Sequence, residues 1–274
     1  MIYFSDNEID GFIAEDVPYF DLTAEILGVD GNASISFVSR DDGIVCGTEE
    51  VARICQKLGL VCEVHAKSGK QVAKGDILVS AKGDAKSALK AWKPSQNILE
   101  YASAVATQTS KMVQAIKEVS PDTHFATTRK TIPATKKLAL KAVLSGGGYA
   151  HRLGLSETVL IFDQYVGLAC MSMKECIAKA KAVTKEHKIA VEVKKYEDAV
   201  SAINAGADIV QCDKLSVDEI SKIKAISGNV VVIATGGINL QNAAQYASTK
   251  PDVIVSSSVY YTKPFDIKVE IKPK

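Results

Sequence analysis

Arginine is scarce in this chain, and half of it lies in one segment. The chain has four arginines against 29 lysines, and Arg129 and Arg152 both fall within residues 127–165. Lys130 follows the first of them and His151 precedes the second. The planar guanidinium group binds carboxylates and phosphates through two parallel hydrogen bonds, which lysine cannot make. These two pairs indicate a pocket for a small anion, although either pair alone is better explained as a solvated surface pair.

Three consecutive glycines, residues 146–148, separate the two basic pairs. Glycine allows a backbone to approach a ligand closely, and it also ends helices. With cationic side chains on both sides, this turn favours a site for a small polyanion.

The composition is that of an ordinary globular protein. Of 274 residues, 47% are apolar and 24% are charged, and the formal net charge is +1. This length suits one large domain, or a barrel with a smaller companion. The charge balance and the few aromatic residues argue against a nucleic-acid-binding protein. The chain contains no run of 18 apolar residues that would indicate a membrane helix, so we expect no membrane insertion.

The cysteines and the acidic N-terminal residues suggest the compartment. Residues 1–18 are acidic and interrupted, unlike a signal peptide. The six cysteines form no Cys-x-x-Cys pair and lie in apolar surroundings. We therefore expect a cytoplasmic protein with reduced, mostly buried thiols, in which Cys170 and Cys176 pack near a helix start.

The first third of the chain predicts a small sheet domain with helices. Ser5 and Glu8 have the spacing of a capping box, so a short helix should open the chain. One further helix is expected near residues 49–58. The β-rich runs are residues 33–39, 43–47, 60–66 and 76–81.

Residues 85–119 are helical by composition, and Pro94 is expected to break or start a helix there. In the later half of this segment, residues that we expect to be buried recur at the spacing of one helix face. The residues of that face are Val105, Thr109, Met112, Ile116 and Val119.

From residue 123 onward, short apolar strands alternate with helical segments. This alternation predicts a parallel sheet that closes as an α/β barrel with fewer strands than usual. The candidate strands are residues 123–127, 158–162, 189–193, 208–212, 230–235 and 252–257. The candidate helices are residues 133–144, 172–186, 196–204, 216–226 and 239–247.

In such a barrel the residues at the carboxyl ends of the strands carry the chemistry. Those ends place cations, two acids and two small-residue turns on one rim. Backbone N–H groups in turns of this kind bind phosphate, which predicts a phosphorylated ligand. The rim residues are Arg129, Lys130, Glu192, Asp213, Gly236, Gly237 and Ser257.

These motifs resemble the quinolinate phosphoribosyltransferase family. The most specific are TRKT-x-P at residues 128–133 and SGGGYAHRLGL at residues 145–155. Further matches are EDVPYFDLT, NILEYASAVAT, VLIFDQ, VEVKKYEDA, IATGGIN and DVIVSSS, in the order of the family. Within the family, the chain is most similar to the ModD branch, which is associated with molybdenum transport.

The resemblance implies a fold, an activity and an assembly. The fold would be an N-terminal α/β sandwich domain (residues 1–104, joined by residues 259–274) and an incomplete α/β barrel (residues 105–258). The activity would be transfer of phosphoribose from phosphoribosyl pyrophosphate to a pyridine carboxylate in the presence of Mg²⁺. The assembly would be a homodimer with shared active sites, in which Lys93 takes the place of an arginine donated across the interface.

The resemblance also assigns roles. Arg129, Lys130, His151 and Arg152 match binders of the substrate carboxylate and pyrophosphate. Glu192 and Asp213 match the acids near the ribose hydroxyls and the metal. The turn Gly236–Gly237, with Ser257, matches the phosphate-binding loops. We expect Lys130, Glu192 and Asp213 to be the catalytic groups.

Besides Lys93, the chain departs from the family in four places. Phe162 replaces a lysine and Tyr165 replaces a histidine of the acceptor pocket. Thr127 replaces an aspartate, and Ser257 replaces a glycine. Loss of a cation beside the acceptor should weaken binding of a substrate with two carboxylates.

Rival interpretations remain open. Glu192 could pair with Lys194 or Lys195, and Asp213 could cap the following helix. The whole protein could be a catalytically drifted nucleotide- or oxyanion-binding protein of a molybdate transport operon. It could also be a barrel lyase that forms a Schiff base on Lys130.

Overall fold

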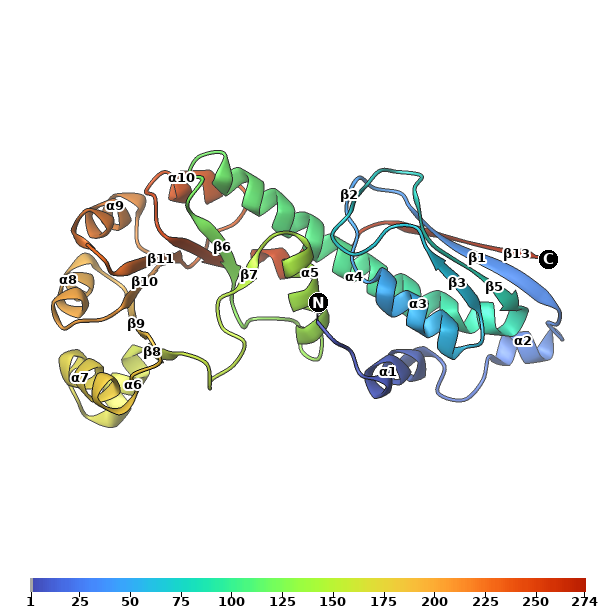
Figure 1. The fold of residues 1–274 in the computed structure, drawn as a ribbon, viewed down its shortest axis with the longest axis horizontal. Helices are drawn as coiled ribbons and strands as arrows, with labels where there is room; N and C mark the ends of the chain where they lie inside the picture. Colours follow the sequence, from blue (N-terminus) through green and yellow to red (C-terminus); the bar gives the residue numbers. More distant parts are fainter. Residues whose placement is uncertain (1) are drawn as a thin grey trace. The chain divides into compact units, whose positions relative to one another are not determined.

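The computed structural model describes residues 2–274, which fold into two compact units (Figure 1). The first unit comprises Met1–Ser110, Ile132–Gly147 and Tyr260–Lys274, and the second comprises Lys111–Thr131 and Gly148–Val259. The domain boundary expected between residues 104 and 105 stays a prediction, and helix α4 (Ala85–Lys117) runs through that point without interruption.

The first unit contains a four-stranded sheet with the order β13-β1-β5-β3. All of its strand pairs are antiparallel. Alternate residues of β1, namely Ala33, Ile35 and Phe37, are buried, as expected for a sheet with one face on the core. The strands are β1 (Asn32–Ser39), β3 (Val61–Val64), β5 (Ile77–Asp84) and β13 (Ile267–Pro273). The separate pair β2 (Gly43–Ile44) and β4 (Gln71–Val72) is shorter than the predicted run at residues 43–47.

Helices of the first unit include the one predicted to open the chain. Ser5 caps α1, and Glu8 completes the capping box from the N3 position. The helices are α1 (Asp6–Asp16), α2 (Leu22–Ile26), α3 (Thr48–Lys57), α5 (Lys136–Ser145) and most of α4. The short helix α2, which Asp21 caps, was not predicted.

Two predictions about α4 are wrong. Pro94 lies inside the helix and does not break it, since buried Ala88, Ala91 and Leu99 on either side of it pack in the core. Tertiary packing here outweighs the roughly 3 kcal/mol that a proline costs in a helix interior. Val119 lies beyond the end of the helix and is exposed, whereas the other four residues of the predicted stripe are fully buried.

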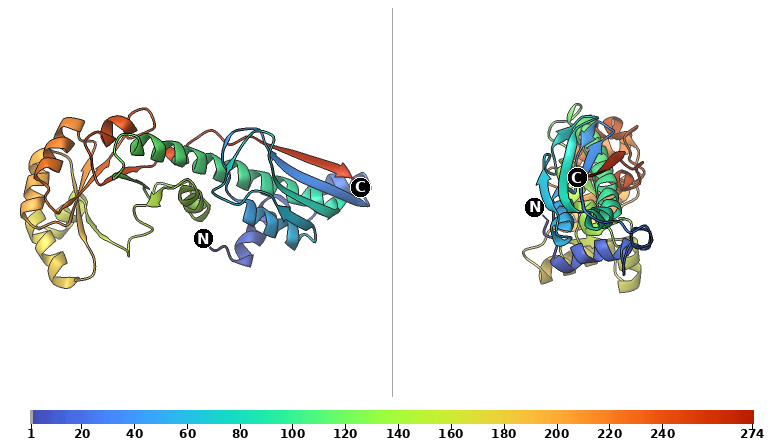
Figure 2. Two further views of the ribbon diagram at one scale, coloured as in Figure 1. Left: turned by 45° about the horizontal axis from the view of Figure 1, so that its top comes forward. Right: turned by 90° about the vertical axis from the view of Figure 1, so that its right-hand side faces the viewer.

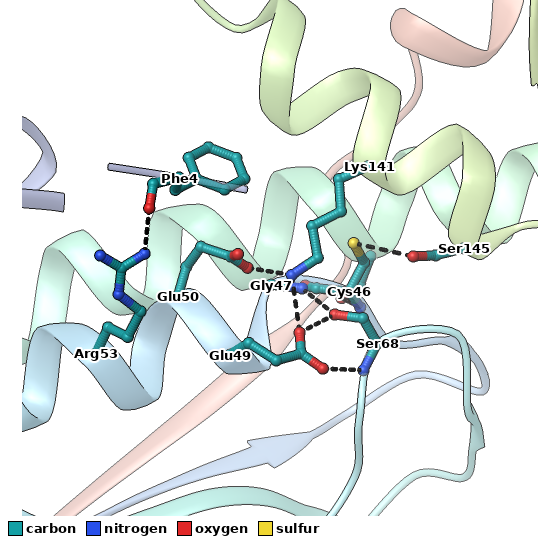
Figure 3. A network of polar contacts seen from close by, with 10 residues as sticks. Phe4, Cys46, Gly47, Glu49, Glu50, Arg53, Ser68, Lys141 and Ser145 are labelled. Carbon is teal, nitrogen blue, oxygen red and sulfur yellow. Dashed lines mark hydrogen bonds and ion pairs between the residues drawn. The ribbon is translucent and has the colours of Figure 1, made fainter. Parts of the chain in front are cut away.

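A buried ion cluster joins α5 to the start of α3 (Figure 3). The Lys141 ammonium group of α5 donates to Glu49 Oε2 at 2.8 Å and to Glu50 Oε2 of α3. Glu49 also accepts from the Ser68 amide at 3.0 Å and from its hydroxyl at 2.5 Å. Every charge in this cluster therefore has a partner, which burial of charge requires.

The second unit is a seven-stranded sheet with the order β7-β6-β12-β11-β10-β9-β8. All six strand pairs are parallel, and β7 and β8 form its two edges, so the barrel is incomplete. The predicted fold class is confirmed. The strands are β6 (His124–Thr127), β7 (Tyr149–Ala150), β8 (Val159–Ile161), β9 (Ile189–Val193), β10 (Ile209–Asp213), β11 (Val231–Thr235) and β12 (Val253–Ser256).

Helices cover one side of this sheet (Figure 1 and Figure 2). Ser172 and Ser216 form the predicted capping boxes at the starts of α7 and α9. The helices are α6 (Asp163–Ala169), α7 (Met173–Val183), α8 (Tyr196–Asn204), α9 (Val217–Ile226) and α10 (Ala243–Ala247), and the 3-10 turn η1 (Ser258–Tyr260) follows β12. The sequence patterns missed α6 and β7, which are short.

All six cysteines are free, and three of them (Cys46, Cys55 and Cys212) are buried. The prediction for Cys170 is wrong, because this residue ends α6 in a left-handed conformation and is exposed. Within residues 2–274, no helix combines the length and apolar character needed to cross a membrane.

Candidate active site

The carboxyl ends of the strands in the second unit surround a cavity of about 510 Å³. Because parallel strands end at one edge of the sheet, residues far apart in sequence meet there. The lining includes every predicted site residue except Lys93, namely Arg129, Lys130, His151, Arg152, Phe162, Glu192, Asp213, Gly236, Gly237 and Ser257. Their chemical roles stay predictions at this point.

Arg152 is the deepest cation of the cavity. Its side chain is only 7% exposed, and one terminal nitrogen donates to the Thr158 carbonyl at 3.1 Å. Its Nε is buried without a hydrogen-bond partner in residues 2–274. Burial, together with the nearby charge of Arg129, lowers the pKa of Arg152. An under-compensated buried cation of this kind is suited to an anionic ligand.

His151 lies next to this arginine, and its amide donates to the Thr127 carbonyl at 3.0 Å. Burial lowers the pKa of His151, and the charge of Arg152 adds to this effect, while the Gln211 side chain opposes it. These surroundings therefore favour the neutral form of the ring. Its Nε2 is buried and has no hydrogen-bond partner within the described chain.

Arg129 and Lys130 follow β6 and are exposed. The Thr128 hydroxyl accepts from the Lys130 amide at 3.1 Å, and the Thr128 amide donates to the Ser256 carbonyl at 3.3 Å. These contacts fix the backbone that presents both cations. Because the side chains of Arg129 and Lys130 are long and exposed, they can contact a ligand that enters the cavity from solvent.

The acidic side of the cavity is formed by β9 and β10. Glu192 accepts a hydrogen bond from Gln211 Nε2 at 2.8 Å, and the two residues are paired in the parallel register. Burial raises the pKa of Glu192, and the charge of Asp213 adds to this, while Gln211 and Lys194 oppose it. Two carboxylates in one cavity offer hard oxygen ligands or acceptors for sugar hydroxyls.

The contacts do not support the rival structural roles, namely an ion pair for Glu192 and a helix cap for Asp213. Lys194 pairs with Asp163 at 2.7 Å, and Lys195 pairs with Asp198 at 3.8 Å. The helix after Asp213 is capped by Ser216 through its own capping box. Glu192 and Asp213 are thus left to face the cavity.

A glycine turn after β11 forms the next part of the rim. Gly236 has φ +89°, and a Cβ there would lie 2.6 Å from Asp213 Oδ1. Gly237 has φ +74°, but a Cβ there would meet nothing within 4 Å. The first glycine is therefore required by contact as well as by conformation, the second by conformation alone.

Serines after β12 complete that part of the rim. The Ser256 hydroxyl donates to the Ile238 carbonyl at 2.5 Å and accepts from the Ser258 amide at 3.0 Å. Ser257 lies between them and lines the cavity beside the glycine turn. Small residues and backbone amides are the usual elements of a phosphate-binding turn.

Phe162 provides an apolar surface at the end of β8. Its ring stacks against that of Tyr165, with centroids 6.2 Å apart. No charge is present at this position, so a ligand group placed here meets aromatic carbon.

Lys93 lies in the first unit, on α4, and does not line the cavity. Its ammonium group donates to Gln96 Oε1 at 3.2 Å and lies 4.7 Å from the centre of the Trp92 ring. The side chain is exposed.

Gln211 and Lys214 are cavity residues that were not among the predicted site residues. Gln211 is 6% exposed, and its Oε1 is one of the buried atoms of residues 2–274 without a hydrogen-bond partner. It lies two residues before Asp213 in β10, so the alternation of a strand places both on the same face. That spacing was the available signal. Lys214 also lines the cavity.

The fold and this site define an open α/β barrel enzyme with an anion-binding rim. Comparisons with known proteins agree. The N-terminal domain of the quinolinate phosphoribosyl transferase family matches residues 21–103, and its C-terminal domain matches residues 105–270.

Relatives match along the whole chain. The protein ModD of Pasteurella multocida, named as a pyrophosphorylase, is 36% identical and the match covers 99% of both chains. A Methanothermobacter thermautotrophicus protein, named as a carboxylating nicotinate-nucleotide pyrophosphorylase, is 30% identical over 95% of this chain and 96% of its own. The solved structure of the nicotinate-nucleotide pyrophosphorylase of Francisella tularensis superposes with a TM-score of 0.90 at 26% identity, covering 97% of this chain and 95% of its own.

The chain belongs to the quinolinate phosphoribosyl transferase family, and it is a phosphoribosyltransferase of the pyrophosphorylase type. The predicted family and enzyme class are confirmed. The comparisons favour neither the drifted binding protein nor the Schiff-base lyase.

Proposed function

We propose that this enzyme transfers phosphoribose from phosphoribosyl pyrophosphate to a carboxylated, pyridine-like acceptor and releases pyrophosphate. The observation that carries the proposal is the composition of one cavity. It combines an under-compensated buried arginine, two carboxylates and a glycine turn suited to phosphate. A donor with phosphate at both ends and an acceptor with a carboxylate would use each of these groups.

The bond changes are a displacement at the anomeric carbon. The bond from this carbon to the pyrophosphate oxygen breaks, its electron pair leaves with pyrophosphate, and the acceptor nitrogen forms the new bond. Arg129 and Lys130 would neutralise charge that builds on the leaving group. The contribution of the protein is to hold both reactants in line and to stabilise this charge, because no protein nucleophile is required.

Arg152 would hold the acceptor carboxylate, and the neutral ring of His151 would hydrogen-bond beside it. Phe162 would contact the face or edge of the acceptor ring. Glu192 and Asp213 would accept hydrogen bonds from the ribose hydroxyls, which orients the anomeric carbon.

The same two acids fit a magnesium ion bound in part by its substrate. In residues 2–274 no cluster of three or more acidic, histidine or cysteine side chains could form a closed metal site. Magnesium is commonly held by one or two carboxylates together with water and substrate phosphates, so two are sufficient. When bound, Mg²⁺ would neutralise charge on the pyrophosphate.

The first test measures pyrophosphate release from phosphoribosyl pyrophosphate and Mg²⁺, with and without quinolinate or nicotinate. Release that depends on a pyridine carboxylate supports the proposal. No binding of phosphoribosyl pyrophosphate, and no release with either acceptor, would contradict it.

Phe162→Lys tests acceptor choice in the same assay. We expect the added cation to lower KM for quinolinate, which has two carboxylates, by about tenfold. KM for nicotinate, with one carboxylate, should change much less. Equal changes for both acceptors would mean that Phe162 does not set acceptor choice. Quinolinate-dependent formation of nicotinate mononucleotide would further place the enzyme in NAD biosynthesis.

A homodimer with shared sites is part of the proposal. Lys93 is exposed and forms no ion pair in the described chain, so it is available to a second copy. Several large apolar side chains near the N-terminus are also exposed and could be covered by association: Tyr19, Phe20, Leu22, Ile26 and Leu27. The free thiols of all six cysteines support a cytoplasmic location.

Subunit mixing tests the shared site. Lys93→Ala and Arg129→Ala would each be inactive alone, yet a mixed dimer would contain one intact site. Mixing and refolding the two in equal amounts should restore about a quarter of the wild-type rate, since half of the dimers are mixed. No recovery, with dimers confirmed by ultracentrifugation, would mean that Lys93 does not act across the interface.

A further inference from the structure

Lys214 holds a backbone conformation that lysine rarely adopts. It directly follows β10 and has φ +59°, in the left-handed region where a Cβ is disfavoured. Its amide donates to the Thr235 carbonyl of β11 at 2.8 Å, which keeps the residue in place. Glycine or asparagine would take this conformation at lower cost, so the lysine side chain itself calls for an explanation.

The stem of Lys214 lies against the glycine turn. A Cβ at Gly236 would lie 2.5 Å from Lys214 Cγ and 2.7 Å from the Lys214 amide nitrogen. Gly236 therefore makes room for this lysine. The contact directs the aliphatic part of the side chain along the rim of the cavity, which Lys214 lines together with Gly237 and Ser257.

The ammonium group of Lys214 is uncommitted. None of the ion pairs among residues 2–274 includes it, whereas its neighbours on the rim, Lys194 and Lys195, each pair with an aspartate. The residue is also exposed. A cation without a protein partner, held beside backbone amides that suit phosphate, is placed for an anionic ligand.

We propose that Lys214 binds the 5′-phosphate of the phosphoribosyl group at the Gly236–Gly237 turn. This inference rests on the proposed function, because it assigns one end of the donor to one part of the cavity. The pyrophosphate end would then belong to Arg129 and Lys130, which follow β6, two strands away from β11 and this turn. Lys214 would select donors that carry a phosphomonoester.

The test compares binding of two separate probes, ribose 5-phosphate and inorganic pyrophosphate, by calorimetry. Lys214→Met should weaken ribose 5-phosphate binding by about tenfold or more, the range for a charge-assisted hydrogen bond. Pyrophosphate binding should change less than twofold. Lys214→Arg should keep most of the affinity, because the charge is retained.

Lys250→Met is a matched control. Lys250 also has a left-handed backbone, with φ +53°, but it does not line the cavity. This variant should bind both probes like the wild type. Lys214→Gly separates backbone from side chain: it should unfold at a temperature at least as high as the wild type while binding ribose 5-phosphate as weakly as Lys214→Met.

The outcomes distinguish this inference from the proposed function. Wild-type protein that binds neither probe would contradict both. Ribose 5-phosphate binding that is equal in wild type and Lys214→Met would contradict only the role of Lys214. Equal weakening of ribose 5-phosphate and pyrophosphate binding would also contradict the role of Lys214. The cause would then be the loss of positive charge in the cavity as a whole, or a structural defect.

Discussion

Two cations are buried among residues 2–274, Lys141 and Arg152, and their surroundings are opposite. Lys141 lies in the first unit between Glu49 and Glu50 (Figure 3), and its side chain is 5% exposed. Arg152, in the second unit, is 7% exposed and has one carbonyl acceptor, with Nε unpartnered among the described residues.

The pKa values of the two groups reflect this difference. Burial opposes the charge of Lys141, but hydrogen bonds and charges of both glutamates outweigh it, so the pKa of Lys141 is raised. Burial and the charge of Arg129 both lower the pKa of Arg152. A buried cation with protein partners supports the fold, whereas one without them marks a site where a ligand supplies the partner.

Removal of Lys141 should have the largest effect on stability. Lys141→Met leaves two glutamates without their cation, and breaking a buried pair in this way costs about 3–5 kcal/mol. Urea unfolding measures the loss. Lys137→Met is the control, because Lys137 pairs with Glu8 at a half-exposed position and should cost under about 1 kcal/mol. Similar losses in the two variants would show that burial of the ion cluster does not matter.

Arg152→Met should show the reverse pattern. We expect kcat/KM to fall about 10²- to 10³-fold, the range for loss of one preorganised charge in an active site. The unfolding midpoint should stay close to that of the wild type, because the arginine is incompletely paired in the free protein. A large drop in the midpoint would mean that Arg152 is a structural cation like Lys141, and the comparison would fail.

The two glycines of the turn after β11 allow a second comparison, within the cavity, with smaller expected effects. Gly236→Ala places a methyl group against the Lys214 backbone and should weaken ribose 5-phosphate binding by tenfold or more, about 1.4 kcal/mol. Gly237→Ala meets no neighbour and should cost only the left-handed backbone preference, about 1–2 kcal/mol of stability. Calorimetry and thermal unfolding of both variants measure these effects. Equal binding by both would show that contact with Lys214 is not what requires Gly236.

Much of this arrangement could be predicted because parallel strands place their carboxyl ends together. Glu192, Asp213 and Gly236 were found from strand ends alone, and the capping serines gave the starts of α1, α7 and α9. Each of these signals is local, so a short window of sequence contains it.

Features that depend on tertiary packing could not be predicted. Pro94 reads as a helix breaker until the core around α4 is known. From the sequence alone, Lys141 would be a solvated residue of an amphipathic helix. Only the packing of α3 shows that two glutamates contact it. The left-handed backbone of Lys214 is held by a hydrogen bond from its amide to the Thr235 carbonyl on a neighbouring strand. No local turn motif in the sequence indicates this conformation.

The smallest expected effect is on pH dependence, and it concerns one glutamate of each unit, Glu49 and Glu192. In the first unit, the pKa of Glu49 is about 2: burial opposes its charge, but bonds from Lys141 and Ser68 prevail. Its stabilising effect is therefore present above the ordinary glutamate pKa of 4.5 and is lost as the pH falls toward 2. In the cavity, burial and Asp213 raise the pKa of Glu192 instead. The folded state thus favours protonated Glu192, and this contribution to stability is lost as the pH rises through its folded pKa.

Activity should follow the opposite direction, because in the proposed mechanism the ribose hydroxyls and Mg²⁺ would require the ionised form of Glu192. We expect kcat/KM to fall on the acid side at a pH above the ordinary pKa of a glutamate. Gln211→Leu removes a hydrogen bond that lowers this pKa, so the acid limb should move to higher pH. Ser248→Ala, at an exposed helix end outside the cavity, should leave the limb in place. An unchanged limb in Gln211→Leu would mean that Glu192 does not set it, and that the two acids do not differ as their surroundings indicate.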